Sequence, residues 1–131
     1  MQRRTYLKTA LALATGTPLA LGADAPKGRI QLHLDLTVLP AKEKEMLQHF
    51  HNVFKPAASK MKGYINVDML KLRSTLAGSA PQSANYRFVL LFESEELRQK
   101  WIATDVHQQV WPPIEKTLAH TKYNVHLFDY A

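Results

Sequence analysis

The sequence predicts an α+β domain of the ferredoxin-like kind, with helices on one face of a four-stranded antiparallel sheet. Residues 29–39 alternate apolar and polar side chains with a period of two, which is typical of a strand. Residues 41–62 instead repeat apolar side chains every three or four positions, which is typical of an amphipathic helix. With the later segments, the predicted order is β-α-β-β-α-β, the split βαβ arrangement.

The first predicted strand covers residues 29–39 and stops at Pro40. Its side chains divide into an apolar face and a polar face. The apolar face consists of Ile30, Leu32, Leu34, Leu36 and Val38, and the polar face of Gln31, His33, Asp35 and Thr37.

The helix over residues 41–62 contains Pro56, which lacks a backbone N–H. We therefore expect a kink or a break near residues 54–55. Gly63 is a natural stop for this helix because glycine readily adopts the left-handed conformation of a C-terminal cap.

Two further strands follow. Residues 64–73 alternate until the phase slips at Leu70 and Leu72, which suggests a bulge or a sheet edge. Residues 74–84 are small and polar, as in a loop. Residues 85–93 predict a third strand that is apolar on both faces.

The C-terminal part completes the pattern. Ser94 resembles an N-cap, and we expect a helix from Glu95 to about Thr104. Trp111-Pro112-Pro113 interrupts regular structure, and Pro113 can begin another helix. Residues 123–130 predict the last strand. Because helices cover only one sheet face, the second apolar face predicts a homodimer.

Composition excludes several kinds of chemistry. The 131 residues include no cysteine, which rules out disulfides, thiolate metal sites and cysteine nucleophiles. The formal charge of +6 comes from scattered Lys and Arg residues rather than a dense run. A nucleic-acid-binding surface calls for a clustered basic face, so we expect no nucleic acid partner.

Residues 1–25 have the three-part pattern of an export signal: a basic start, an uncharged run and a small-x-small cleavage site at Ala23-Asp24-Ala25. The uncharged run, residues 9–23, is shorter than the roughly 20 apolar residues of a spanning helix. We therefore expect no stable membrane anchor, and a single domain over residues 26–131.

The segment Arg3-Arg4-Thr5-Tyr6-Leu7-Lys8 resembles the twin-arginine export motif, with Tyr6 in place of the usual Phe. This resemblance implies a bacterial protein that is exported in folded form to the periplasm or secreted. The alternative is an ordinary secretory signal that happens to contain two arginines.

Two groups of residues are candidates for chemistry or binding. His33, Asp35 and His126 share one sheet face if the first and last strands are neighbours, and they could hold a metal, act as an acid–base pair or form a hydrogen-bonded polar patch. The aromatic residues favour a packed core over a ligand pocket. This aromatic set consists of Phe50, Phe54, Phe88, Phe92 and Trp101.

A family resemblance rests on three motifs: Leu39-Pro40-Ala41-Lys42, the Lys62-Gly63-Tyr64 turn after Pro56, and Trp101 followed by residues 104–107 and Trp111-Pro112. These features resemble the antibiotic biosynthesis monooxygenase domains, including their quinol-monooxygenase-like members, within the dimeric α/β-barrel superfamily.

The resemblance implies oxidation of a small aromatic phenol or quinol by molecular oxygen, with no metal, flavin or other cofactor. His107 would be the base, with His33 and Asp35 as the next pair to consider. Heme-degrading relatives use an Asn–Trp–His set, and Phe92 and Trp111 stand where the Trp and His are expected, so we expect no heme. The ligand contacts would come from Phe92, Trp101, Trp111 and His126. The alternative function is a non-catalytic dimeric binding module on the same fold.

Overall fold

The computed structural model describes residues 28–80 and 83–131, so the predicted signal at residues 1–25 lies outside the described residues. All adjacent strands of the four-stranded sheet pair antiparallel, in the order β2-β3-β1-β4, which confirms the predicted ferredoxin-like fold. The strands are β1 (Ile30–Leu36), β2 (Tyr64–Lys71), β3 (Tyr86–Phe92) and β4 (Asn124–Asp129).

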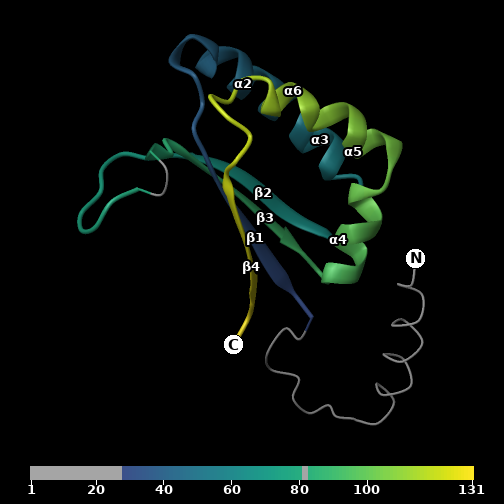
Figure 1. Ribbon diagram of the computed structural model, residues 1–131. Helices are drawn as coiled ribbons and strands as arrows, with labels where there is room; N and C mark the ends of the chain where they lie inside the picture. Colours follow the sequence, from purple (N-terminus) through teal and green to yellow (C-terminus); the bar gives the residue numbers. More distant parts are fainter. Residues whose placement is uncertain (1–27, 81–82) are drawn as a thin grey trace, which may run out of the picture.

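The helices lie in one layer against the sheet (Figure 1). A continuous helical segment follows β1, and three short helices follow β3. Their bounds are η2 (Pro40–Lys42), α2 (Glu43–His49), η3 (Phe50–Phe54), α3 (Lys55–Ala58), α4 (Glu95–Ile102), α5 (Asp105–Val110) and α6 (Pro112–Glu115). Across the described ranges, no helix has the length and apolar character needed to cross a membrane.

A kink or a break was expected near residues 54–55; the helix does not end there but changes from the π turn η3 to the α-helix α3. Lys55 keeps helical dihedral angles, and its N–H donates to the carbonyl oxygen of Phe50, five residues earlier. This wider π turn shifts the hydrogen-bond ladder directly before Pro56, so the helix tolerates a residue that has no N–H to donate.

The segment between Trp101 and Trp111 is also more regular than expected, because it forms helix α5. Thr104 supplies the reason: its side-chain oxygen accepts a hydrogen bond from the backbone N–H of His107 at 3.2 Å. A threonine cap of this kind stabilises the first turn of a short helix.

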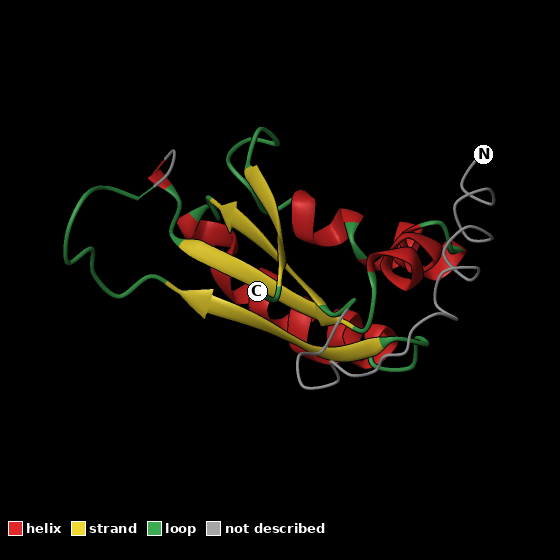
Figure 2. Cartoon of the chain, turned by 90° about the horizontal axis from the view of Figure 1, so that it is seen from below, coloured by secondary structure: helices red, strands yellow, loops and turns green. Residues whose placement is uncertain are grey.

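The strand register divides the sheet into two faces. Leu32 pairs with Leu90 and Leu34 with Phe88, and these side chains are buried under the helices. On the other face, His33 lies opposite Val89 and His126. In Figure 2 the strands lie nearest the viewer, with helices behind them, so no helix of the described residues covers this open face.

Phe54 is the centre of the core between the helices and the sheet. Its ring centroid lies 5.4 Å from that of Phe88, 5.5 Å from Trp101 and 5.9 Å from Trp111. Phe92 stacks on Trp101 at 5.7 Å. The aromatic set therefore packs as a core, as the sequence predicted, and joins the two helical segments to β3.

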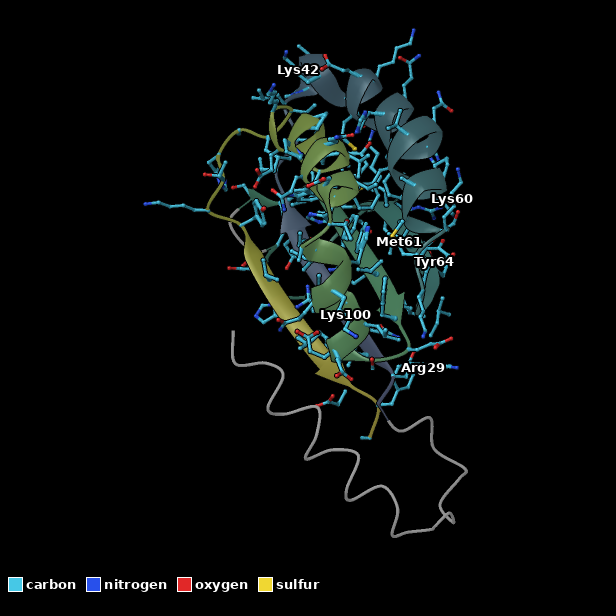
Figure 3. The ribbon with its side chains drawn as sticks, turned by 90° about the vertical axis from the view of Figure 1, so that its right-hand side faces the viewer. Arg29, Lys42, Lys60, Met61, Tyr64 and Lys100 are labelled. Atoms are coloured by element: carbon cyan, nitrogen blue, oxygen red, sulfur yellow. The ribbon has the colours of Figure 1, made fainter. Side chains whose placement is uncertain are left out.

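Gly63 makes the turn from α3 into β2, where Met61 and Tyr64 lie next to each other (Figure 3). Its φ is +95°, and a Cβ at this position would lie 2.8 Å from the side chain of Leu97. Both the backbone conformation and the contact with α4 therefore require glycine.

Gly63→Ala is expected to destabilise the protein more than Gly78→Ala. Gly78 also has a positive φ, +77°, but no atom lies within 4 Å of its would-be Cβ. Strain alone costs about 1 kcal/mol or more at either site, and overpacking against Leu97 adds about 1–3 kcal/mol at Gly63. Urea unfolding of both variants measures the difference, and equal losses would show that the contact with Leu97 is unimportant.

Candidate functional site

Two helix caps position Trp101 and His107. Ser94 accepts a hydrogen bond from the backbone N–H of Leu97 at the start of α4, and Thr104 caps α5. The Thr104 hydroxyl also donates to the carbonyl oxygen of Trp101 at 2.7 Å. One threonine thereby joins the end of α4 to the start of α5 and sets how Trp101 and His107 face each other.

The rings of Trp101 and His107 meet edge to face, with centroids 4.7 Å apart and planes at 89°. Trp101 is only 3% exposed. Trp101 Nε1 and His107 Nδ1 are both buried and have no hydrogen-bond partner within the described part of the chain. Buried polar atoms are nearly always paired, so two unpaired ones on rings that touch each other mark this group as a candidate place for a polar group of a ligand.

Burial lowers the pKa of His107, and the positive charge of Arg98 lowers it further, against a smaller opposite effect from Glu115. Arg98 is held in place by two hydrogen bonds to Glu95, at 2.6 and 2.7 Å. His107 is therefore neutral at pH 7 and can accept a proton, as a general base must.

Trp111 contrasts with Trp101. Its indole N–H donates to the oxygen of Tyr123, and the Tyr123 hydroxyl donates to Glu115 at 2.7 Å. Burial and the bond to Glu115 raise the pKa of Tyr123 to about 12. The indole N–H of Trp111 therefore has a hydrogen-bond partner within the fold, whereas that of Trp101 has none among the described residues.

The helix-facing side of β4 is only partly covered by the described residues. Val125 and Leu127 pair with Leu34 and Leu32, so they point to the helical side of the sheet, yet they are 51% and 45% exposed. Tyr123, whose ring contacts that of Trp111, directly precedes this strand. Val125 and Leu127 thus form an exposed apolar strip on the helical face.

The structure separates the predicted site residues into two groups. His107, Trp101, Phe92 and Trp111 lie on the helical side of the sheet. The predicted His33, Asp35 and His126 share the open face, as expected from their alternation. The sheet separates them from His107.

The open-face group is a polar network rather than a metal centre. Asp35 accepts a hydrogen bond from Arg87 at 2.8 Å, and His33 Nε2 lies 2.9 Å from Gln31 Oε1. Burial lowers the pKa of His33, with Arg87 and His126 acting in the same direction and Asp35 against them. In the described ranges, no three His, Asp or Glu side chains gather closely enough to hold a metal ion.

Three residues that set the charge and hydrogen bonding around the site were not predicted from the sequence: Arg98, Glu115 and Tyr123. They come from two helices and the start of a strand, and only the tertiary fold brings them together. Thr104 could have been found, because a threonine followed by an aspartate is a common helix start.

Comparison of the chain with known protein families and with curated protein sequences finds no match. Comparison with solved structures finds many chains of the same fold. A provisionally assigned antibiotic biosynthesis monooxygenase from Caulobacter crescentus is 19% identical with a TM-score of 0.63, over 82% of this chain and 93% of that chain.

SnoaB, a cofactor-independent oxygenase from Streptomyces nogalater, is 12% identical with a TM-score of 0.61, covering 77% of this chain and 91% of that chain. A dimeric ferredoxin-like protein from Jannaschia is 12% identical with a TM-score of 0.63, covering 78% and 97%. At these identities the similarity shows the fold, which this chain shares with antibiotic biosynthesis monooxygenase-like structures.

We expect the imidazole of His107 to titrate below its ordinary pKa of 6.5, and Arg98→Gln to raise the titration midpoint because it removes a positive charge. The neutral form is favoured in the folded state, so this contribution to stability is complete above pH 6.5 and is lost as the pH falls through the lowered pKa.

An NMR titration of the histidine side chains measures both midpoints. Glu115→Gln serves as the opposite control and should lower the midpoint, since Glu115 favours the charged form. A His107 midpoint at or above 6.5 would contradict the described environment.

Proposed function

We propose that the protein binds a small aromatic phenol or quinol beside Trp101 and His107 and oxidises it with molecular oxygen, without a metal or flavin. The observation that carries this proposal is that two rings in edge-to-face contact, Trp101 and His107, each hold a buried nitrogen without a hydrogen-bond partner among the described residues. A hydroxyl group on an aromatic ring could satisfy one or both nitrogens while the ring meets apolar and aromatic side chains.

The reaction needs a base and an environment with little water. Phenol and one O2 yield a quinone and one water, so the substrate loses two hydrogens, gains one oxygen atom and supplies all the electrons. His107, neutral at pH 7, would take the phenolic proton as electron density moves to oxygen, and that proton would leave in the water formed. The Trp101 N–H would donate to the phenolic oxygen.

His107→Ala is expected to lower turnover at least about tenfold, since a positioned base typically contributes about 10²–10⁴-fold. Oxygen uptake by the purified protein with a panel of phenols, quinols and catechols, with and without chelator, measures this. Trp101→Phe keeps an aromatic ring but removes the N–H, and should weaken substrate binding.

His120→Ala is the matched histidine control, because His120 is an exposed residue outside the helices and strands and its loss should leave turnover unchanged. Activity that survives His107→Ala would place both the base and the substrate elsewhere, and His33 and Asp35 on the open face would be tested next.

A second candidate function is a binding module without chemistry. The two unpaired nitrogens of Trp101 and His107 are compatible with such a module, because a bound ligand could satisfy their hydrogen bonds without being converted. Aromatic ligands that raise the melting temperature, with no oxygen uptake for any of them, would favour this function.

We propose further that the protein is a homodimer joined through the open sheet face. Val89 is only 9% exposed and Leu91 is half-buried on this face, while Phe128 is 51% exposed. A hollow of about 420 Å³ between β1 and the C-terminal residues opens there as well. The Jannaschia protein of similar fold is dimeric, which supports this proposal.

Light scattering at micromolar concentration should give about twice the monomer mass at pH 7.5, and less as the pH falls below 6.5. His33 faces Arg87, Asp35 and His126, and burial lowers its pKa, so its neutral form suits a buried interface and protonation opposes association. His33→Gln should reduce the pH dependence. A monomer at all concentrations near neutral pH would contradict the dimer.

Export through the twin-arginine route is part of the proposal, resting on residues 3–8 of the sequence. Exchange of Arg3 and Arg4 for Lys should block export, and protein recovered from the periplasm should begin at Pro26 by mass spectrometry. Undiminished export of the Lys variant would leave the ordinary secretory route, and an intact Met1 in the periplasm would argue against cleavage.

A further inference from the structure

The connection between β2 and β3 projects from the body of the molecule as an arm (Figure 1). We define the arm as residues 72–80. Its base is fixed by a hydrogen bond from the N–H of Leu72 to the carbonyl oxygen of Asn85 at 2.9 Å. Beyond that bond, no hydrogen bond or ion pair ties residues 73–80 to another described residue.

The arm carries an apolar side chain, Leu76, that the described residues leave almost uncovered. Leu76 is 94% exposed, so almost its whole apolar side chain is in contact with water. Arg73 is the only charged residue between Leu72 and Ala84, and the rest are mainly Ser, Thr, Ala and Gly. Such a segment can pack closely against another protein surface, because it has few charges to desolvate.

A hollow of about 480 Å³ lies between the arm and the end of the sheet. Asp35, Leu70 and Arg87 line it from the sheet, and all three belong to the open face by their register. Leu70 and Leu72 are about half exposed beside it. The arm therefore borders the open face and extends its apolar surface beyond the edge of the sheet.

Most charges at this hollow are paired. Arg87 lies 2.8 Å from Asp35 and Lys71 lies 2.6 Å from Glu43, which leaves Arg73 as the one lining charge without an ion pair among the described residues. A surface that matches this one, apolar with mostly paired charges, is the open face of a second copy of the same chain, which a twofold dimer would bring opposite.

We propose that the arm embraces the second subunit of the homodimer, with Leu76 buried against the partner's open face. This inference rests on the proposed dimer and adds a specific contact to it. The arm gains order and burial only on association, which accounts for an apolar side chain that would otherwise remain in water.

The first test is Leu76→Ser, measured by analytical ultracentrifugation of the full chain at pH 7.5. The dimer dissociation constant should rise at least about tenfold, because a twofold dimer loses the buried leucine twice. The melting temperature under monomeric conditions should not change, since Leu76 has no contacts to lose within its own subunit. Val53→Ser is the matched control: Val53 is 42% exposed on the helical layer, and its replacement should leave the constant unchanged.

The second test replaces Leu76 by the photoreactive residue p-benzoylphenylalanine. Irradiation of the purified protein should give a covalent dimer, with the cross-link mapped by mass spectrometry to open-face residues of the other copy. The same replacement at Val53 should give no such product.

The outcomes distinguish an error in the proposed arm contact from an error in the proposed dimer. A dimer that is unaffected by Leu76→Ser and gives no cross-link overturns the arm contact and leaves the proposed dimer standing. A wild-type protein that is monomeric throughout overturns both. Cross-linking of Leu76 to residues of its own subunit would also overturn the proposal, as it would show an arm folded back on its own hollow.

Discussion

The contacts of the Phe54 ring hold this structure together. Phe54 comes from the helical segment after β1, and its ring meets Phe88 on β3, Trp101 on α4 and Trp111 at the start of α6. All of these residues lie on one side of the sheet, so the helices assemble there and leave the other side open. Trp101 is thereby buried in the core, and its N–H has no partner among the described residues. The π turn before Pro56 lets the helical segment that carries Phe54 continue without a break.

Because the helices pack on one side of the sheet, the two sheet faces suit different kinds of binding. The helical face contains the unpartnered nitrogens, the lowered pKa of His107 and the exposed apolar strip of β4, which together suit a ligand. The open face contains the His33 network, nearly buried apolar residues on β3 and the arm, which together suit a second subunit. The sheet lies between them, so ligand binding and association can be tested by separate substitutions.

Much of the fold could be predicted because its signals are local. The alternation in β1 correctly placed His33 opposite the core, and the aromatic set was correctly expected to pack. Helix α5 was missed because proline and tryptophan residues nearby obscure a short segment that depends on the Thr104 cap. An irregularity near Pro56 was correctly expected, but its form could not be predicted because a π turn leaves no mark in the pattern of apolar residues. The surroundings of His107 could not be predicted, since Arg98 on α4 and Glu115 on α6 approach it only because both helices pack against α5.

The most direct test of the ligand site uses the indole N–H signals of the two tryptophans. Trp111 donates to Tyr123 and serves as an internal reference, whereas the N–H of Trp101 has no partner among residues 28–80 and 83–131. Titration of ¹⁵N-labelled protein with a phenol, with the signals assigned by Trp111→Phe, should shift the Trp101 resonance strongly and that of Trp111 weakly. A phenol that binds without moving the Trp101 resonance would contradict the account, because the unpaired N–H would then have no part in recognising the ligand.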